Sequence, residues 1–109
     1  MYLQSYFVEF FGTMFFVYIT LATGNPLAIG AALALVILLT HNISGGCINP
    51  VVTIVMSSAG QLPSSEVIPY CLAQIFGGLV ALEIYKNVSD SNGFTTITNS
   101  MSSERGGTK

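Results

Sequence analysis

The sequence predicts an all-α membrane protein with three transmembrane helices and one re-entrant half-helix. Charged residues make up 7% of the 109 residues, against about 25% in ordinary soluble domains. Hydrophobic residues make up 51%, the mean hydropathy is +0.68, and no charge occurs between Phe10 and Ser65. Such a chain cannot cover a compact globule with polar surface. These observations exclude a soluble enzyme.

The few charges and the cysteines exclude further classes of protein. Three basic residues and a net charge of −2 exclude nucleic acid as a partner, because phosphate binding depends on clustered lysine and arginine. Cys47 and Cys71 show no metal-ligand spacing, and no catalytic triad or phosphate-binding glycine loop is present. We therefore expect the protein to bind no cofactor and no metal. We also expect an integral, multi-pass membrane protein that is surrounded by the lipid bilayer.

The first two predicted spans are separated by a tight turn. A bilayer core takes about 20 helical residues, and residues 3–22 supply this length before the helix-breaking run Thr23-Gly24-Asn25-Pro26. The second span covers residues 26–42. Pro26 suits its first turn, because the N–H that proline lacks has no partner within a helix there.

The third predicted span covers residues 67–85, with Pro69 in its first turn. The remaining residues, 87–109, hold many Ser, Thr, Asn and Gly and little apolar periodicity. We expect them to form a disordered polar tail behind a domain of residues 1–86. All three basic residues follow the third span, which weakly favours a cytoplasmic C-terminal end. Because the bias in the distribution of basic residues is weak, insertion of the chain in either membrane orientation is also permitted.

The segment between the second and third spans lacks the charges of an ordinary loop. It contains a glycine pair, the dipeptide Asn49-Pro50 and an apolar run too short to cross a bilayer. Asn49 is a favoured helix N-cap and Pro50 a favoured first residue, which predicts a half-helix over residues 50–57. Irregular backbone at membrane depth requires burial in protein or a water-filled cavity. The partial positive charge at this helix start would repel cations and offer hydrogen bonds to neutral solutes.

Four motifs, in order, carry a resemblance to a known family. The sequence SGGCINPVVT at 44–53 resembles the first signature loop of the aquaporins and aquaglyceroporins, S-G-x-H-x-N-P-A-V-T. EFFGT at 9–13, LAIG at 27–30 and YCLAQIFGG at 70–78 resemble motifs of that family's first three helices. The resemblance implies half of an aquaporin-like fold, because members contain two inverted three-helix repeats and this chain has one.

A single repeat cannot enclose the family's pore, which leaves several readings open. Two copies pair in opposite orientations, or the chain docks against another membrane subunit, and it then passes water or small neutral solutes such as glycerol. Alternatively, it is a structural membrane subunit that retains the half-aquaporin fold without conducting. A truncated fragment without activity is a third reading.

The resemblance also implies roles for single residues at the pore. Asn49 would donate hydrogen bonds to the permeating molecule, and Pro50 would start the half-helix. Val51 replaces the family's alanine and would narrow the approach of two half-helices. Cys47 stands at the place of a pore-lining histidine, with a small buried hydrophobe as the alternative role.

Further implied residues concern selectivity and support of the loop. Ile29 and Val52 stand where a strict water filter would have an aromatic residue and an arginine, which favours solutes such as glycerol. Glu9 lies in the first span and would brace the loop backbone, although a carboxylate near a helix end can also reach the lipid headgroups. Gln74 would form hydrogen bonds within the bundle.

Overall fold

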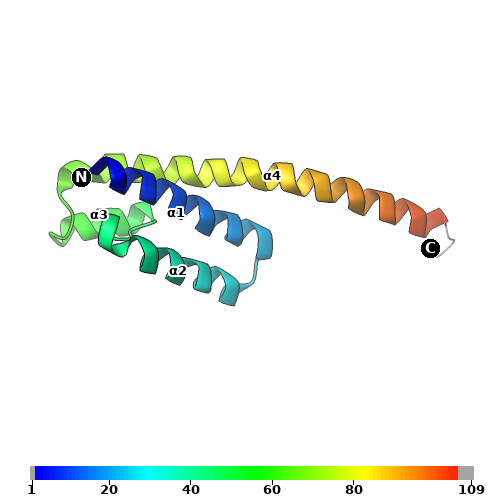
Figure 1. Cartoon of the computed structure of the whole chain (residues 1–109), viewed down its shortest axis with the longest axis horizontal. Helices are drawn as coiled ribbons and strands as arrows, with labels where there is room; N and C mark the ends of the chain where they lie inside the picture. The colour runs from blue at the N-terminus through cyan, green and yellow to red at the C-terminus, as the bar shows by residue number, and fades with distance from the viewer. Residues whose placement is uncertain (1, 106–109) are drawn as a thin grey trace.

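A computed structural model describes the backbone of residues 2–105 and the side chains of residues 2–89. The described residues form four α-helices and no strand, arranged as in Figure 1. The helices are α1 (Tyr2–Thr23), α2 (Pro26–Ser44), α3 (Pro50–Ser58) and α4 (Val67–Arg105), and the short 3-10 turn η1 (Ser64–Glu66) leads directly into α4.

Three segments are long and apolar enough to cross a membrane, as the sequence predicts: Tyr2–Thr23, Pro26–Ser44 and Ser64–Ser89. The chain is an integral, multi-pass membrane protein. By contrast, α3 has nine residues. At 1.5 Å per residue it is about 14 Å long, or half of a bilayer core.

The central helix of the bundle is α1, which packs against both α2 and α4. In Figure 1, α3 lies at the end of the molecule where α2 stops and α4 starts, so the chain enters and leaves this segment on one side. α3 itself packs against α4. The start of α1 and the last turn of α4 lie at opposite ends, as three crossings require.

Two helices begin with the same dipeptide. The Asn25 side chain accepts hydrogen bonds from the backbone N–H groups of Leu27 and Ala28 at the start of α2. The Asn49 side chain accepts one from Val51 N at the start of α3. In each case a proline follows the asparagine, which removes one N–H group that would otherwise need a partner.

Close contact between α1 and α4 depends on Gly77. A Cβ atom built there would collide with the Phe10 carbonyl oxygen and would lie 3.3 Å from Met14 N. The next residue, Gly78, has room, because its nearest neighbour is Val17 Cγ2 at 3.7 Å. Small residues that let helix backbones approach are typical of membrane helix packing.

The end of α4 differs from the sequence prediction. We expected the helix to end at residue 85 and a disordered tail over residues 87–109, whereas α4 continues to Arg105. Residues 87–105 contain no proline and one glycine, Gly93. Their Ser, Thr and Asn residues have low helix propensity but do not stop a helix. Residues 106–109 of the expected tail lie outside the described part.

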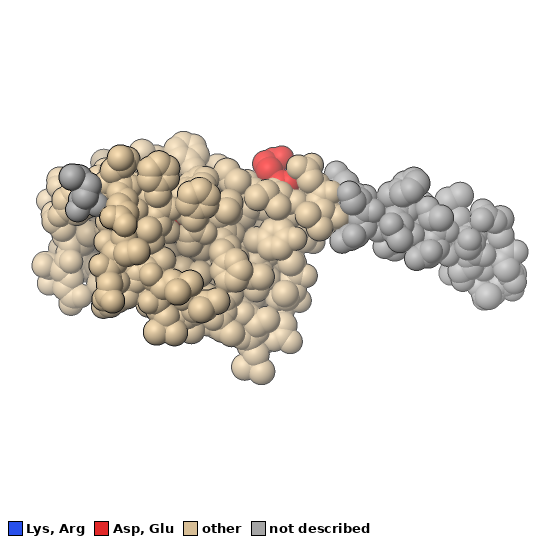
Figure 2. All heavy atoms as spheres, viewed as in Figure 1, with Lys and Arg blue, Asp and Glu red and all other residues tan. Residues whose placement is uncertain are grey.

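The interior of the bundle contains many polar groups, whereas its surface is largely apolar. Within residues 2–89, eight polar or charged side chains are buried, among them Glu9 and Thr53 at 0% exposure. On the face shown in Figure 2, one small acidic patch lies over α4, and the rest of the described surface there is uncharged. This distribution suits a protein with lipid around it and hydrogen-bonding groups that must be satisfied internally.

Candidate functional site

The buried carboxylate of Glu9 connects α1 to the loop before α3. Its Oε2 atom accepts hydrogen bonds from Ser44 Oγ at 2.6 Å and Cys47 N at 3.1 Å. Its Oε1 atom accepts from Ile48 N and from Gln74 Nε2, both at 2.8 Å. Four donors therefore surround one carboxylate, and they come from α2, the loop and α4.

A second chain of hydrogen bonds continues from Gln74 to the start of α3. Gln74 Nε2 also donates to Thr53 Oγ1 at 2.7 Å, and Thr53 Oγ1 donates to the Asn49 carbonyl at 2.9 Å. Both Thr53 and Gln74 are buried. The first turn of α3 is thus attached to α4 by side chains and not by apolar packing alone.

The ends of the loop have anchors of their own. Tyr70 Oη donates to the Ser44 carbonyl at 2.8 Å, and Ser5 Oγ donates to the Ile43 carbonyl at 3.0 Å. These bonds satisfy carbonyl groups in the last turn of α2, which have no partner within the helix. The end of α2 is therefore held against both α1 and α4.

Ile48 adopts a backbone conformation that is rare for its residue type. Its φ of 60° lies in the left-handed region, which β-branched residues seldom occupy. Glu9 binds its N–H, and Thr13 Oγ1 donates to its carbonyl at 3.4 Å. The side chain is 2% exposed. Contacts on all sides therefore hold this residue in a strained turn, and that turn directs the chain into Asn49.

Asn49 lies at the open side of this network. Its Oδ1 atom caps α3 through Val51 N at 2.7 Å, and the residue is exposed. Because the capping bond uses the oxygen, the two N–H groups of the amide are available to a molecule outside the chain. The partial positive charge of the α3 start lies at the same place.

A groove of about 460 Å³ runs beside Asn49 between α1 and α4. Three polar residues, Thr13, Asn49 and Gln74, contribute to its lining. The other lining residues are Phe16, Val17, Leu21, Ile48, Pro50, Ile75, Gly78, Leu79 and Leu82. The groove therefore joins an apolar wall to a short row of hydrogen-bonding groups.

The other residues proposed for the pore from sequence fall in different places. Val51 and Val52 are exposed on α3, at 68% and 41%, and Pro50 is partly buried in the groove. Ile29 lies in the first turns of α2, at the opposite end of that helix from the loop, and does not line the groove. The structure therefore brings Asn49, Pro50, Val51 and Val52 together and leaves Ile29 apart.

The structure places Cys47 in the interior. The side chain is 4% exposed and packs with Leu62 and Tyr70, beside the partly buried Tyr6 and Met56. Only its backbone N–H takes part in the Glu9 network. Within this chain Cys47 occupies a small apolar space and does not reach the groove.

Sequence reasoning proposed Glu9 and Gln74 but missed their polar neighbours Ser5, Thr13, Glu66 and Tyr70, although a signal existed. Ser5, Glu9 and Thr13 recur every four residues, which places them on one face of α1. Glu66, Tyr70 and Gln74 do the same at η1 and α4. Polar residues at helical spacing inside apolar spans indicate a face that meets other polar groups.

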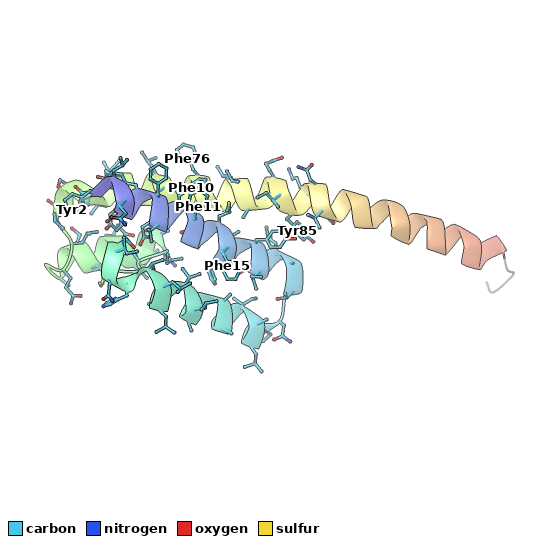
Figure 3. The ribbon with its side chains drawn as sticks, in the orientation of Figure 1. Tyr2, Phe10, Phe11, Phe15, Phe76 and Tyr85 are labelled. Atoms are coloured by element: carbon cyan, nitrogen blue, oxygen red, sulfur yellow. The ribbon has the colours of Figure 1, made fainter. Side chains whose placement is uncertain are left out.

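Aromatic side chains cover the outside of the same helices. Figure 3 shows Phe11 and Phe15 along α1 and Phe76 on α4. They are 53%, 41% and 55% exposed. The site is therefore an internal polar network behind an aromatic, lipid-compatible surface. Among the described residues, no group of three His, Cys, Asp or Glu side chains could hold a metal ion.

Comparison with known proteins gives consistent matches. A family model described as Major intrinsic protein matches residues 1–108. Aquaporin-8 of Notomys alexis is 36% identical over 104 residues, covering 85% of this chain and 40% of the relative. Glycerol uptake facilitator protein-like 6 of Lactiplantibacillus plantarum is 34% identical over 102 residues, with coverages of 85% and 47%.

A third relative, Aquaporin Z of Photorhabdus laumondii, is 37% identical over 81 residues, covering 73% of this chain and 35% of the relative. No solved structure matches the chain significantly. The chain spans less than half the length of these three relatives.

Proposed function

Because the chain belongs to the major intrinsic protein family, we propose that it forms one half of a membrane channel that passes water or small uncharged solutes such as glycerol. The relatives are named as aquaporins and as a glycerol uptake facilitator, which are transport proteins and not enzymes. This chain is half as long or less, so its own activity depends on what completes it.

The observation that carries this proposal is the arrangement at Asn49. An amide with free N–H groups stands at the positive end of a half-helix, beside a groove that opens between α1 and α4. Such an end stabilises the oxygen of a neutral molecule and repels cations. In the surrounding network each donor meets an acceptor, so the position of Asn49 is fixed before any solute arrives.

A second half is needed because α3 is covered on one side only. Thr53 faces α4, whereas Val51, Val52, Ile54 and Val55 are all exposed. A channel wall made by α3 therefore needs a second structure opposite it. A second copy in the opposite membrane orientation would supply one, and so would another membrane subunit.

The proposed solute range includes glycerol. The groove beside Asn49 combines apolar side chains with three polar ones, which suits a molecule with both C–H and O–H groups. Val52 contributes an apolar side chain to the exposed face of α3. A narrow filter restricted to water would need more hydrogen-bonding groups at its tightest point.

The test is solute passage into liposomes that contain the purified chain. Stopped-flow light scattering under water and glycerol gradients should show faster volume changes than in empty liposomes. Asn49→Asp should abolish the gain, because aspartate keeps the capping oxygen but replaces the N–H donors by negative charge.

Asn25→Asp is the matched control. Asn25 also caps a helix directly before a proline, and it is exposed at the other end of α2. This variant should conduct as well as the original chain. Rates equal to those of empty liposomes, with helical protein confirmed in the bilayer, would contradict the channel and favour a structural subunit of a larger complex.

A further inference from the structure

A second groove, of about 450 Å³, lies on the outer surface of the bundle between α1 and α2. It shares no lining residue with the groove beside Asn49. Figure 3 shows two of its residues, Phe11 and Phe15, along α1. Its walls are two rows of exposed, bulky apolar side chains spaced four residues apart: Phe7, Phe11 and Phe15 on α1, and Leu35, Leu39 and Ile43 on α2.

The two rows of side chains stand opposite each other across a narrow floor. Gly12 is part of this floor, and a Cβ atom added there would lie 2.9 Å from Val36 Cγ1 and 3.6 Å from Thr40 Cγ2. Because α1 and α2 run in opposite directions, this contact sets the level at which the helices meet. It places Phe7 opposite Ile43, Phe11 opposite Leu39 and Phe15 opposite Leu35. The groove therefore runs straight along the two helices, with a wall on each side.

The groove suits an apolar occupant. Among the described residues that line it, Thr40 is the one with a polar side chain. Its hydroxyl donates to the Val36 carbonyl at 2.8 Å, within α2 itself, and the residue is buried. Water or a polar solute would lose hydrogen bonds on entering such a place, whereas a hydrocarbon chain has none to lose.

The length of the groove matches one leaflet of the bilayer. Its wall on α1 extends from Phe7 to Phe15, which at 1.5 Å per residue is about 12 Å. Half of a hydrocarbon core is about 15 Å thick. Because α1 begins at Tyr2, the groove starts close to one membrane surface and ends near the middle of the bilayer. This is the depth that an acyl chain of that leaflet occupies.

A helix from a second copy of the chain fits the groove less well. Membrane helices approach each other through small residues, whereas both walls here consist of large side chains and Gly12 lies on the floor between them. A helix with its side chains is about 10–12 Å wide and packs along the whole crossing of about 30 Å. An extended acyl chain is much thinner and can lie between the two walls.

We propose that this groove binds one acyl chain of a membrane phospholipid, from the leaflet in which α1 begins. The two rows of Phe, Leu and Ile side chains contact the acyl chain from both sides. Recognition rests on the hydrocarbon, because no Lys or Arg precedes Lys86 in the sequence to bind a phosphate group at the start of α1. The site goes beyond the proposed function, because it uses neither Asn49 nor the groove beside it.

Retention of lipid in detergent tests the site. The full chain is reconstituted in phosphatidylcholine liposomes, dissolved in an excess of mild detergent and measured by native mass spectrometry. We expect the mass of the chain with one phosphatidylcholine. Leu39→Trp fills the groove and should lose most of the bound lipid. Leu38→Trp is the control, because Leu38 is the neighbouring residue, is similarly exposed at 77% against 68%, and does not line the groove.

A fluorescent reporter locates the retained lipid without filling the groove. The chain has no tryptophan, so Phe15→Trp introduces a single one in the wall. Val80→Trp is the control at similar depth, because Gly77 meets α1 between Phe10 and Met14. Phe15 and Val80 are 41% and 37% exposed. After reconstitution with phosphatidylcholine brominated on its acyl chains, and dilution into detergent, Phe15→Trp should be quenched and Val80→Trp should stay bright.

Several outcomes would overturn the site. These are no retained phospholipid on the original chain, equal retention by Leu39→Trp and Leu38→Trp, or equal quenching of the two tryptophans. A lipid-free dimer that Leu39→Trp dissociates and Leu38→Trp leaves intact would place a second copy in the groove instead. Neither readout depends on solute passage, so a chain that retains lipid without conducting keeps this site and loses the channel. A conducting chain without retained lipid shows the reverse.

Discussion

The carboxylate of Glu9 binds the backbone N–H of Ile48 at 2.8 Å, across 39 residues of sequence. Ile48 is the non-glycine residue with a positive φ among the described residues, and it directly precedes the cap of α3. A left-handed conformation costs an L-residue roughly 1–2 kcal/mol. The buried carboxylate and the packed side chain offset this cost and fix the direction in which Asn49 leaves the loop.

Glu9→Gln should lower the free energy of unfolding by about 2–4 kcal/mol. Either orientation of the new amide would place its NH₂ group against a fixed N–H donor, from Cys47 at the Oε2 position or from Ile48 and Gln74 at the Oε1 position. The measurement is unfolding in mixed micelles by added SDS, followed by circular dichroism. Glu83→Gln is the control, because Glu83 is 69% exposed and should change stability by less than about 0.5 kcal/mol. Equal losses in both variants would refute a special role for Glu9.

Gly77→Ala should separate α1 from α4, whereas Gly78→Ala should be tolerated. The new Cβ at residue 77 would collide with the Phe10 carbonyl, which belongs to a rigid backbone. At residue 78 the nearest atom, Val17 Cγ2, is at an ordinary 3.7 Å. We expect Gly77→Ala to cost about 1–3 kcal/mol, measured as a lower melting temperature in detergent. Glycine-to-alanine replacement in a helix otherwise stabilises the fold, so a Gly78→Ala variant as unstable as Gly77→Ala would contradict the contact with Phe10 as the cause of the loss.

Thr53→Val removes the hydroxyl that joins Gln74 to the Asn49 carbonyl while keeping the shape of the side chain. We expect a loss of about 1–3 kcal/mol in the free energy of unfolding, because the buried Gln74 Nε2 atom loses an acceptor, whereas the Asn49 carbonyl keeps its bond from Thr53 N. Hydrogen exchange of the backbone amides in α3, followed by mass spectrometry, should become faster. In the control variant Thr20→Val, the lost hydroxyl bonds only Phe16 O of its own helix. Unchanged exchange in α3 of Thr53→Val would contradict the network described above.

Tyr6→Phe should loosen the junction between α1 and η1. The Tyr6 hydroxyl donates to Glu66 Oε1, and Glu66 is buried, so its loss should cost about 1 kcal/mol. Limited proteolysis of the loop before η1 should accelerate in this variant. Tyr18→Phe is the matched substitution, because the Tyr18 ring packs edge-on against Tyr85 and phenylalanine retains that contact. Equal cleavage rates for Tyr6→Phe and the original chain would contradict a stabilising role of the Tyr6–Glu66 hydrogen bond.

The sequence predicted the spans and the half-helix well, because both follow from strong local rules. About 20 apolar residues are needed to cross a bilayer, and Asn-Pro is a strong start signal for a helix, as at Asn25 and Asn49. The C-terminal boundary of α4 was predicted badly. Weak helix formers such as Ser and Asn do not reveal whether a helix that is already nucleated continues through them.

Several residues of the site could be predicted from the sequence, but the hydrogen bonds that connect them could not. Glu9, Asn49 and Gln74 stood out because polar groups are costly in a membrane. Their partners include backbone N–H groups of Cys47 and Ile48, which every residue type possesses. The left-handed turn at Ile48 had no sequence signal, because isoleucine is among the residues least suited to it.

The distances in sequence between Glu9 and its partners bear on how the protein is made. Its donors follow 35, 38, 39 and 65 residues later in the chain. At translation rates of about 5–20 residues per second, Gln74 is synthesised roughly 3–13 s after Glu9. During that interval α1 carries a carboxyl group without its final partners. The hydrogen-bond network of Glu9 is therefore completed only when α4 arrives.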